Sequence, residues 1–361
     1  MSSDVTTPAE GLSRRTVIRS AVAAGAVLPL GGMTSLQRPA LLDTLSQAPI
    51  CHVADGTPPL VAKPGTKLRL TWNANAICTV GVPVASQRGI FGRHNLDVEL
   101  VNFGGSTDQL LEAISAGKAD AGVGMALRWL KPLEQGFDVK ITTAIHGGCM
   151  RLFAKPESGI RSVADLKGKT VGVSDMAAPD KNFFSIMAAK QGLDPNQDIE
   201  WRQFPADLLG VALQKGEVQA VTLGDPLGWV VRERDKLYEV ANNLSGEYQH
   251  RACCVLGVRG GLVRGDRAAA GALTQSLLEA QDYVAANPDE AAALFAPYSP
   301  VPAAQLAAML RSHTHQHHPT GAALKQEIVA YADELKLVGV MRPRTDTARF
   351  ADKVYADVLA A

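Results

Sequence analysis

The chain has no excess of charge of either sign, because its 361 residues include 36 Lys and Arg and 36 Asp and Glu. Aromatic residues are also scarce, at 5%. Proteins that bind nucleic acids or anionic membranes usually carry a basic patch, and single-stranded nucleic acids are commonly held on aromatic side chains. We therefore expect no nucleic-acid partner and no polybasic membrane contact.

Cysteine is sparse and odd in number. The five thiols are Cys51, Cys78, Cys149, Cys253 and Cys254. Such a set is not a disulfide framework, although an oxidising compartment would permit one bridge.

Catalytic fingerprints and long apolar runs are missing as well. We find no nucleophile elbow, phosphate-binding P-loop or dinucleotide-binding glycine motif. Beyond the first forty residues, no segment reaches the roughly 18 apolar residues that a membrane-spanning helix needs. We expect a protein without catalysis and without a cofactor.

The N-terminal region carries an export pattern. Arg14 and Arg15 lie within the sequence SRRTVI, and an apolar run follows over residues 21–30. A charged start followed by a short apolar stretch is typical of a signal peptide, and paired arginines indicate the twin-arginine route. We interpret residues 1–40 as this signal and residues 41–66 as a linker, which places the protein in the periplasm or another extracytoplasmic space. The alternative is an N-terminus that carries two arginines by chance.

From residue 67 onward, strand-like and helix-like segments alternate. This rhythm, with short turns between the segments, predicts α/β lobes with mostly parallel sheets flanked by helices. After residue 266 the pattern is helical and rich in Ala and Leu. We expect strands at 68–72, 98–103, 121–125, 170–174 and 199–204, and helices at 79–89, 108–116 and 181–190.

One internal similarity favours two related lobes. Residues 108–121 (DQLLEAISAGKADA) align with residues 207–220 (DLLGVALQKGEVQA). Each copy begins with an Asp, runs through a helical pattern to a Gly and enters an apolar strand, which is the order of an N-cap and a C-terminal glycine. Chance recurrence of such units is common in α/β proteins, so the copies carry weight mainly because they lie about a hundred residues apart.

Three segments resemble one known family. They are residues 87–99 (QRGIFGRHNLDVE), 116–122 (AGKADAG) and 162–173 (SVADLKGKTVGV). In this order they are similar to the periplasmic solute-binding proteins of ABC importers for nitrate, taurine and aliphatic sulfonates. The resemblance implies a two-lobed type II periplasmic binding protein fold, with the chain crossing between lobes near residues 145–153 and 250–258. We assign residues 67–147 and 257–361 to lobe 1 and residues 148–256 to lobe 2.

The same resemblance implies a function. The protein would be a monomer that captures a small anionic or zwitterionic solute of the sulfonate, taurine or nitrate class, and would deliver it to an ABC permease in the inner membrane. The solute would lie between the lobes at the carboxyl ends of the strands, where open α/β sheets bind ligands.

Candidate ligand contacts come from loops that follow expected strands. Helix N-termini and their loops offer N–H groups to anions, although ordinary helix capping explains the same residues. Asp225 suits an amine or amide of the ligand, or is simply an N-cap. Trp229 is an aromatic contact or core filler. The full candidate set is Asn73, Asn75, Cys78, Gly105, Ser106, Met125, His146, Ser174, Met176, Asp225, Trp229 and Cys253.

The main alternative is a pyrimidine-precursor binding protein or a synthesis-type enzyme with a His/Cys metal site. His146, Cys149, His250, Cys253 and Cys254 fall on the two expected crossings, and His and Cys are metal ligands. A related pyrimidine-synthesis family shares the fold and uses a His and a Cys cluster in iron-dependent chemistry, but this chain has one adjacent Cys pair and no standard zinc spacing. We predict no metal ligands. A second His group, residues 313–318 (HTHQHH), is expected at an exposed helix end.

Overall fold

The computed structural model describes residues 59–103, 107–315 and 317–360. Every described residue belongs to one compact unit, Thr44–Ala361. The expected signal peptide, most of the expected linker, and the candidates Gly105 and Ser106 lie outside the described residues.

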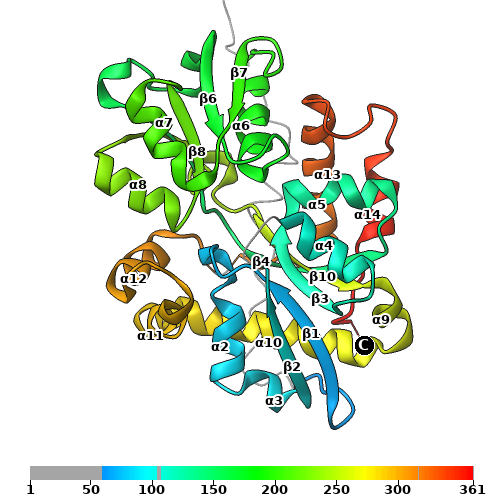
Figure 1. Cartoon of the computed structure of the whole chain (residues 1–361). Helices are drawn as coiled ribbons and strands as arrows, with labels where there is room; N and C mark the ends of the chain where they lie inside the picture. Colours follow the sequence, from blue (N-terminus) through cyan, green and yellow to red (C-terminus); the bar gives the residue numbers. More distant parts are fainter. Residues whose placement is uncertain (1–58, 104–106, 316, 361) are drawn as a thin grey trace, which may run out of the picture. The chain divides into compact units, whose positions relative to one another are not determined.

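In these described ranges the strands form two five-stranded sheets of equivalent topology (Figure 1). The first has the order β2-β1-β3-β10-β4 and the second has the order β7-β6-β8-β5-β9. In each sheet one strand, β10 or β5, runs antiparallel to its neighbours. The expected α/β architecture is confirmed, with mixed sheets. The strands are β1 Thr66–Trp72, β2 Leu96–Asn102, β3 Ala121–Met125, β4 Val139–His146, β5 Met150–Ala154, β6 Lys169–Val173, β7 Ile199–Gln203, β8 Ala220–Gly224, β9 Tyr238–Asn242 and β10 Cys254–Arg259.

Helices cover both sheets, and those after β10 form the helical tail (Figure 1). None of the helices in the described ranges has the length and apolar character to span a bilayer. The helices are α2 Gly81–Gln87, α3 Ile90–Arg93, α4 Thr107–Ser115, α5 Ala126–Gln135, α6 Pro179–Lys190, α7 Leu209–Lys215, α8 Leu227–Asp235, α9 Gly260–Gly265, α10 Arg267–Ala286, α11 Pro288–Phe295, α12 Ala303–Ser312, α13 Gly321–Leu337 and α14 Thr347–Val354.

The two similar sequence segments occupy equivalent places. The first copy runs through α4 to the start of β3, and the second runs through α7 to the start of β8, so each leads into the third strand of its sheet. The helices end before Gly117 and Gly216, whose φ angles of 71° and 74° are left-handed and suit glycine. The prediction of two related lobes is confirmed by this shared topology.

Close packing on the first sheet depends on two strand glycines. Gly124 in β3 and Gly257 in β10 lie on neighbouring strands beneath the fully buried indole of Trp129 in α5. A Cβ atom at Gly124 would lie 2.1 Å from the indole ring, and one at Gly257 would lie 2.6 Å from it. The absence of side chains at both positions therefore lets α5 pack directly on the sheet. Trp129 is core filler, as is the buried Trp72.

The chain passes between the sheets after β4 and again between β9 and β10. The expected boundary at residues 256 and 257 falls inside β10, whose residues pair with β3 and β4 of the first sheet. Strand pairing thus places Cys254–Arg259 in the first sheet, and the return crossing ends before this strand.

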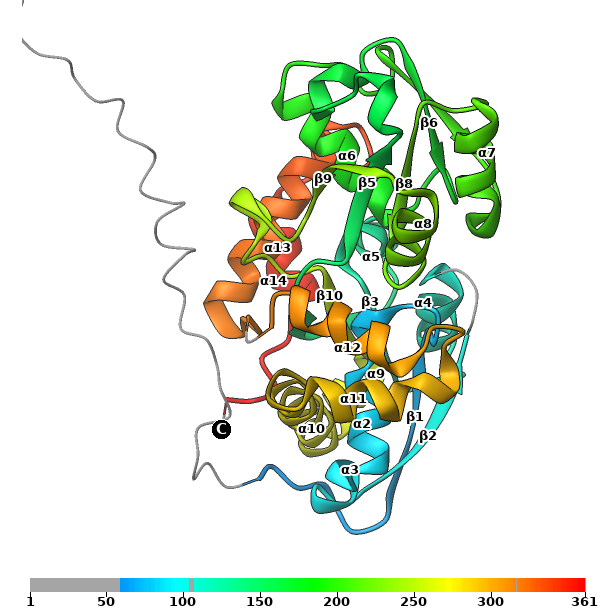
Figure 2. The same ribbon diagram turned by 90° about the vertical axis from the view of Figure 1, so that its left-hand side faces the viewer.

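The helix α13 adds a noncovalent tie between the two halves. It packs against α5 and α14 and also against α6, beside the second sheet (Figure 2). Glu334 of α13 accepts hydrogen bonds from Lys190 of α6, at 2.6 Å, and from Arg251 of the return crossing, at 2.9 Å. Part of the tail that was assigned to lobe 1 therefore contacts both halves.

Candidate functional site

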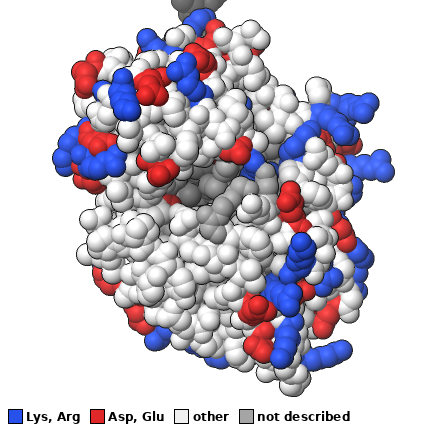
Figure 3. All heavy atoms as spheres, viewed as in Figure 1, with Lys and Arg blue, Asp and Glu red and all other residues white. Residues whose placement is uncertain are grey.

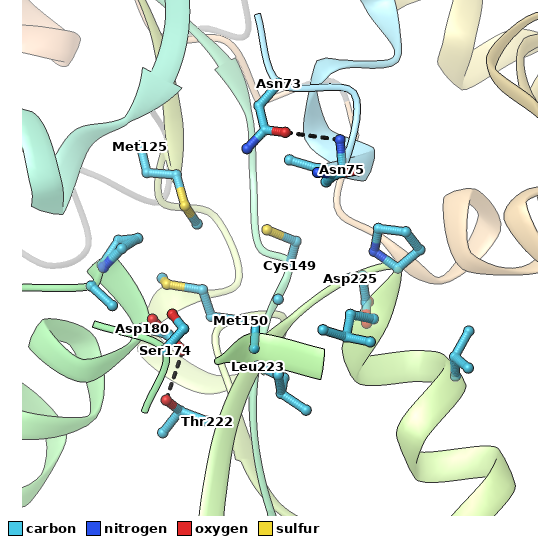
Figure 4. A pocket seen from close by; sticks show the side chains of 18 of the residues that line it. Asn73, Asn75, Met125, Cys149, Met150, Ser174, Asp180, Thr222, Leu223 and Asp225 are labelled. Atoms are coloured by element: carbon cyan, nitrogen blue, oxygen red, sulfur yellow. Dashed lines mark hydrogen bonds between the residues drawn. The ribbon is translucent and has the colours of Figure 1, made fainter. Parts of the chain in front are cut away.

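A cavity of about 860 Å³ lies between the two sheets. Its lining comes from the loop after β1, the ends of β3, β6 and β8, and the segment between α11 and α12. Figure 4 shows side chains from both sheets pointing into it, with Asn73 on one side and Leu223 and Thr222 on the other. This is the position that the strand topology predicts for a ligand, because the carboxyl ends of the parallel strands meet there.

Most of the cavity wall is apolar. Met125 and Met150 face each other from the two halves (Figure 4). On the outer face, charged side chains lie mainly toward the margins, and the surface over α2, α11 and α12 carries few of them (Figure 3). The apolar lining residues include Ala76, Met125, Met150, Ala178, Pro179, Leu223, Pro226, Leu227, Val230 and Val301.

Five of the candidate residues line the cavity: Asn73, Asn75, Met125, Ser174 and Asp225. The sequence pointed to them because each residue ends a predicted strand or lies in the loop that follows one. Their role in binding a ligand stays a prediction.

Five other candidates lie away from the cavity lining. Cys78, His146 and Cys253 are buried behind it, Trp229 is half-buried on α8, and Met176 is 48% exposed. The structure therefore does not bring these side chains to the cavity. In contrast, sequence reasoning missed Arg128, Cys149, Asp180 and Thr222, which do line it.

The Asn73 loop is organised by its own amides. The Asn75 N–H donates to Asn73 Oδ1 at 2.9 Å (Figure 4), and the Ala74 N–H donates to Asn102 Oδ1 at 3.0 Å. Asn side chains commonly stabilise such turns. The loop is thereby held against the end of β2.

Asp225 is the centre of a buried charge network. Its carboxylate accepts from Arg151 Nε at 2.9 Å and from the Trp229 N–H at 3.0 Å, and it lies 2.9 Å from His313 Nε2. Burial alone would raise the pKa of Asp225, but the bonds to His313 and Arg151 outweigh it and hold this pKa below its usual value. Asp225 thus supports the start of α8, as the N-cap alternative expects, and its oxygens accept from protein donors. Its contact with a ligand stays a prediction.

An ion pair crosses the cavity. Arg128 Nη1 of α5 lies 3.1 Å from Asp175 Oδ1, which follows β6 of the second sheet. Burial raises the pKa of Asp175, but the Ala177 N–H and the Arg128 guanidinium lower it more, so the net shift is downward. This pair joins the two halves at the cavity lining.

Asp180 is a second buried carboxylate of the lining. It stands in the first turn of α6, is 6% exposed and accepts from Thr222 Oγ1 at 2.7 Å (Figure 4). Burial raises the pKa of Asp180, and the Thr222 hydroxyl and backbone N–H groups offset this only in part.

Four thiols gather at the two crossings. Cys78, Cys149, Cys253 and Cys254 are all buried and free, and hydrogen bonds link each of them to two of the others. Bonds from Cys149 and Cys254 lower the pKa of Cys253 to about 5. Only Cys149 of this group belongs to the cavity lining.

The histidines after α12 are not on the surface. His313, His317 and His318 are buried, which corrects the expectation of an exposed helix end. The segment turns inward because its imidazoles find carboxylates there: His313 meets Asp225, and His317 Nε2 lies 2.8 Å from Glu327. Burial and the neighbouring His313 hold the pKa of His146 well below its usual value.

In the part of the chain that the structure describes, no three His, Cys, Asp or Glu side chains are arranged to hold a metal ion.

Comparison with known proteins identifies one family. Residues 78–291, more than half of the chain, match the family model described as NMT1/THI5 like. A Haemophilus influenzae protein named for thiamine biosynthesis is 28% identical over 268 residues, which cover 68% of this chain and 76% of that protein.

Two solved structures share the fold. The alkanesulfonate-binding protein SsuA from Xanthomonas axonopodis pv. citri, bound to MOPS, has a TM-score of 0.68 at 20% identity and covers 81% of this chain and 99% of its own. The periplasmic nitrate-binding protein NrtA from Synechocystis PCC 6803 has a TM-score of 0.67 at 15% identity and covers 84% of this chain and 88% of its own. The expected periplasmic binding protein fold is confirmed by these likenesses.

Proposed function

The chain belongs to the NMT1/THI5-like family, and from this premise we propose that it is the solute-binding component of an ABC importer. One observation carries the proposal: the cavity lies between two topologically equivalent sheets and is lined by both. A solute there contacts both halves and so stabilises their closed arrangement, which is the state that a permease can recognise.

The export route, location and partner in this proposal are inferred from the sequence. We infer export by the twin-arginine route, an extracytoplasmic location, and an inner-membrane permease as partner of the monomer. The solute is a small anionic or zwitterionic molecule, as the similar sulfonate-binding and nitrate-binding structures suggest.

Binding can be tested with a variant that fills the cavity. Gly224 lines the cavity, and a Cβ at this position would meet only the Cys149 carbonyl, at 3.9 Å. We expect Gly224→Leu to weaken solute binding at least about tenfold, with little change in thermal stability, because the added side chain enters open space. Gly92→Leu is the matched control, since no atom lies near a Cβ there and Gly92 is outside the lining.

The measurement is native mass spectrometry of the purified chain, followed by calorimetric titration with nitrate, taurine, alkanesulfonates and pyrimidines. A bound organic mass that Gly224→Leu loses supports the proposal. Stoichiometric iron or zinc that is lost on replacing Cys253 and Cys254 would instead support the metal-dependent enzyme.

A further inference from the structure

The charged residues of the cavity lining are strongly unequal in sign. Among the described residues, the lining contains four carboxylates, at Asp175, Asp180, Asp207 and Asp225, and one cation, Arg128. Arg128 already pairs with Asp175. The cavity therefore offers no uncommitted side-chain cation to an anionic ligand in the part of the chain described.

Three of the four carboxylates need no ligand. Asp175 has Arg128, Asp225 has Arg151 and His313, and Asp207 is exposed to water. Asp180 differs from them, because it is buried and forms no ion pair in the described ranges. A buried carboxylate without a cation is costly in the free protein unless something supplies a positive charge.

The protein's own nearby cation does not supply that charge. Lys181 is the next residue, but its ammonium lies over the Trp201 ring, 5.5 Å from the ring centre, and it is not part of the lining. The hydrogen bond from Thr222 fixes the Asp180 carboxylate at the cavity wall without neutralising it. The position is therefore prepared for a donor that comes with the solute.

We propose that Asp180 is a specificity-determining residue that accepts a protonated amino group of the solute. This inference rests on the proposed solute-binding function and changes its ligand class from anions and zwitterions to amine-bearing solutes, so that a zwitterion or an organic ammonium binds and a simple anion of equal size does not. The two methionines and the surrounding aliphatic side chains pack against the carbon body of that solute.

The test uses three probes with the same three-carbon body: propane-1-sulfonate, propylammonium and 3-aminopropane-1-sulfonate. The full chain is titrated with each probe by calorimetry. We expect the two amine-bearing probes to bind at least about tenfold more tightly than propane-1-sulfonate. Asp180→Asn should weaken them by roughly thirtyfold or more, as removal of one partner of a buried charge pair does, and leave propane-1-sulfonate unchanged or tighter.

Two further variants serve as a control and as a second test. Asp97→Asn changes an exposed aspartate on β2, outside the lining, and should alter no affinity. Thr222→Val keeps the carboxylate but removes its hydroxyl donor, which raises the pKa of Asp180 further. Because a protonated carboxyl no longer attracts an ammonium, binding of propylammonium should then be lost at a higher pH than in the unchanged protein.

Propane-1-sulfonate binding as tightly as 3-aminopropane-1-sulfonate, or an equal loss of both in Asp180→Asn, would overturn this inference and leave the proposed function standing. Failure of the unchanged protein to bind any of the three probes, with no organic mass retained on purification, would overturn both.

Discussion

Asp225 joins three parts of the molecule through one carboxylate: Arg151 of β5, His313 after α12, and the first turn of α8. We expect Asp225→Asn to lower the free energy of unfolding by about 3–5 kcal/mol, because it leaves the buried guanidinium of Arg151 without its main counter-charge. Urea denaturation measures this loss. Asp207→Asn, at an exposed carboxylate, should change stability by no more than about 0.5 kcal/mol. Equal losses of unfolding free energy in the two variants would show that the burial of Asp225 does not determine its contribution to stability.

The same carboxylate predicts a pH dependence. Because the folded-state pKa of Asp225 is lowered, its contribution to stability is present above the ordinary aspartate pKa of about 3.9 and is lost as the pH falls through the lower folded value. The stability difference between the unchanged protein and Asp225→Asn should therefore shrink as the pH falls below about 4. Urea denaturation midpoints of both proteins, measured from neutral pH to below pH 4, test this prediction. A stability difference that grows on acidification would refute it.

Residues at strand ends could be predicted from sequence, whereas residues brought in by helices could not. Asn73, Met125 and Ser174 reach the cavity because parallel strands end there. Arg128 and Asp180 lie on α5 and α6, and which side of a helix faces the cavity depends on how it packs on its sheet. The burial of His313 was missed for a related reason: its partner Asp225 lies 88 residues earlier in the chain.

Among the elements, β3 and β10 are sensitive to small changes, because their glycines lie against an indole ring. We expect Gly124→Ala to destabilise the protein by about 1–3 kcal/mol, because the new methyl group would overlap the indole of Trp129 and the core must shift to hold it. Thermal unfolding tests this. Gly92→Ala in α3 is the control, since no atom lies within 4 Å of its Cβ position, and it should be neutral or slightly stabilising. Unchanged stability in Gly124→Ala would mean that α5 does not pack as described.

The order of strands and helices was more predictable than the sheet membership of one strand. Alternation of apolar and helical segments located β1, β3 and α6 to within a few residues. The pattern of β10 (CVLGVR) reads as an apolar strand but carries no sign of the sheet to which it belongs. That choice is made by pairing with β3 and β4, which are more than a hundred residues away along the chain.

For the whole molecule, the Arg128–Asp175 pair is the feature that favours closure across the cavity. Asp175 is 44% exposed, so solvent screens the pair and we assign it only about 0.5–1 kcal/mol. Arg128→Met should then weaken solute binding roughly two- to fivefold and increase the radius of gyration of the ligand-free protein in small-angle scattering. Lys131→Met is the control, because Lys131 pairs with Glu134 within the same helix. A scattering curve unchanged by Arg128→Met would show that this ion pair does not hold the two halves closed.

The place of β10 in the first sheet has a consequence for the order in which the molecule is made. The second sheet uses a continuous stretch of chain, from Met150 to Asn242, so it can be completed as soon as that stretch has left the ribosome. The first sheet begins earlier but lacks its fourth strand in the order β2-β1-β3-β10-β4 until residue 259 has been synthesised, which leaves the edges of β3 and β4 unpaired in the meantime. The half of the molecule that starts first during synthesis is therefore the half that finishes last.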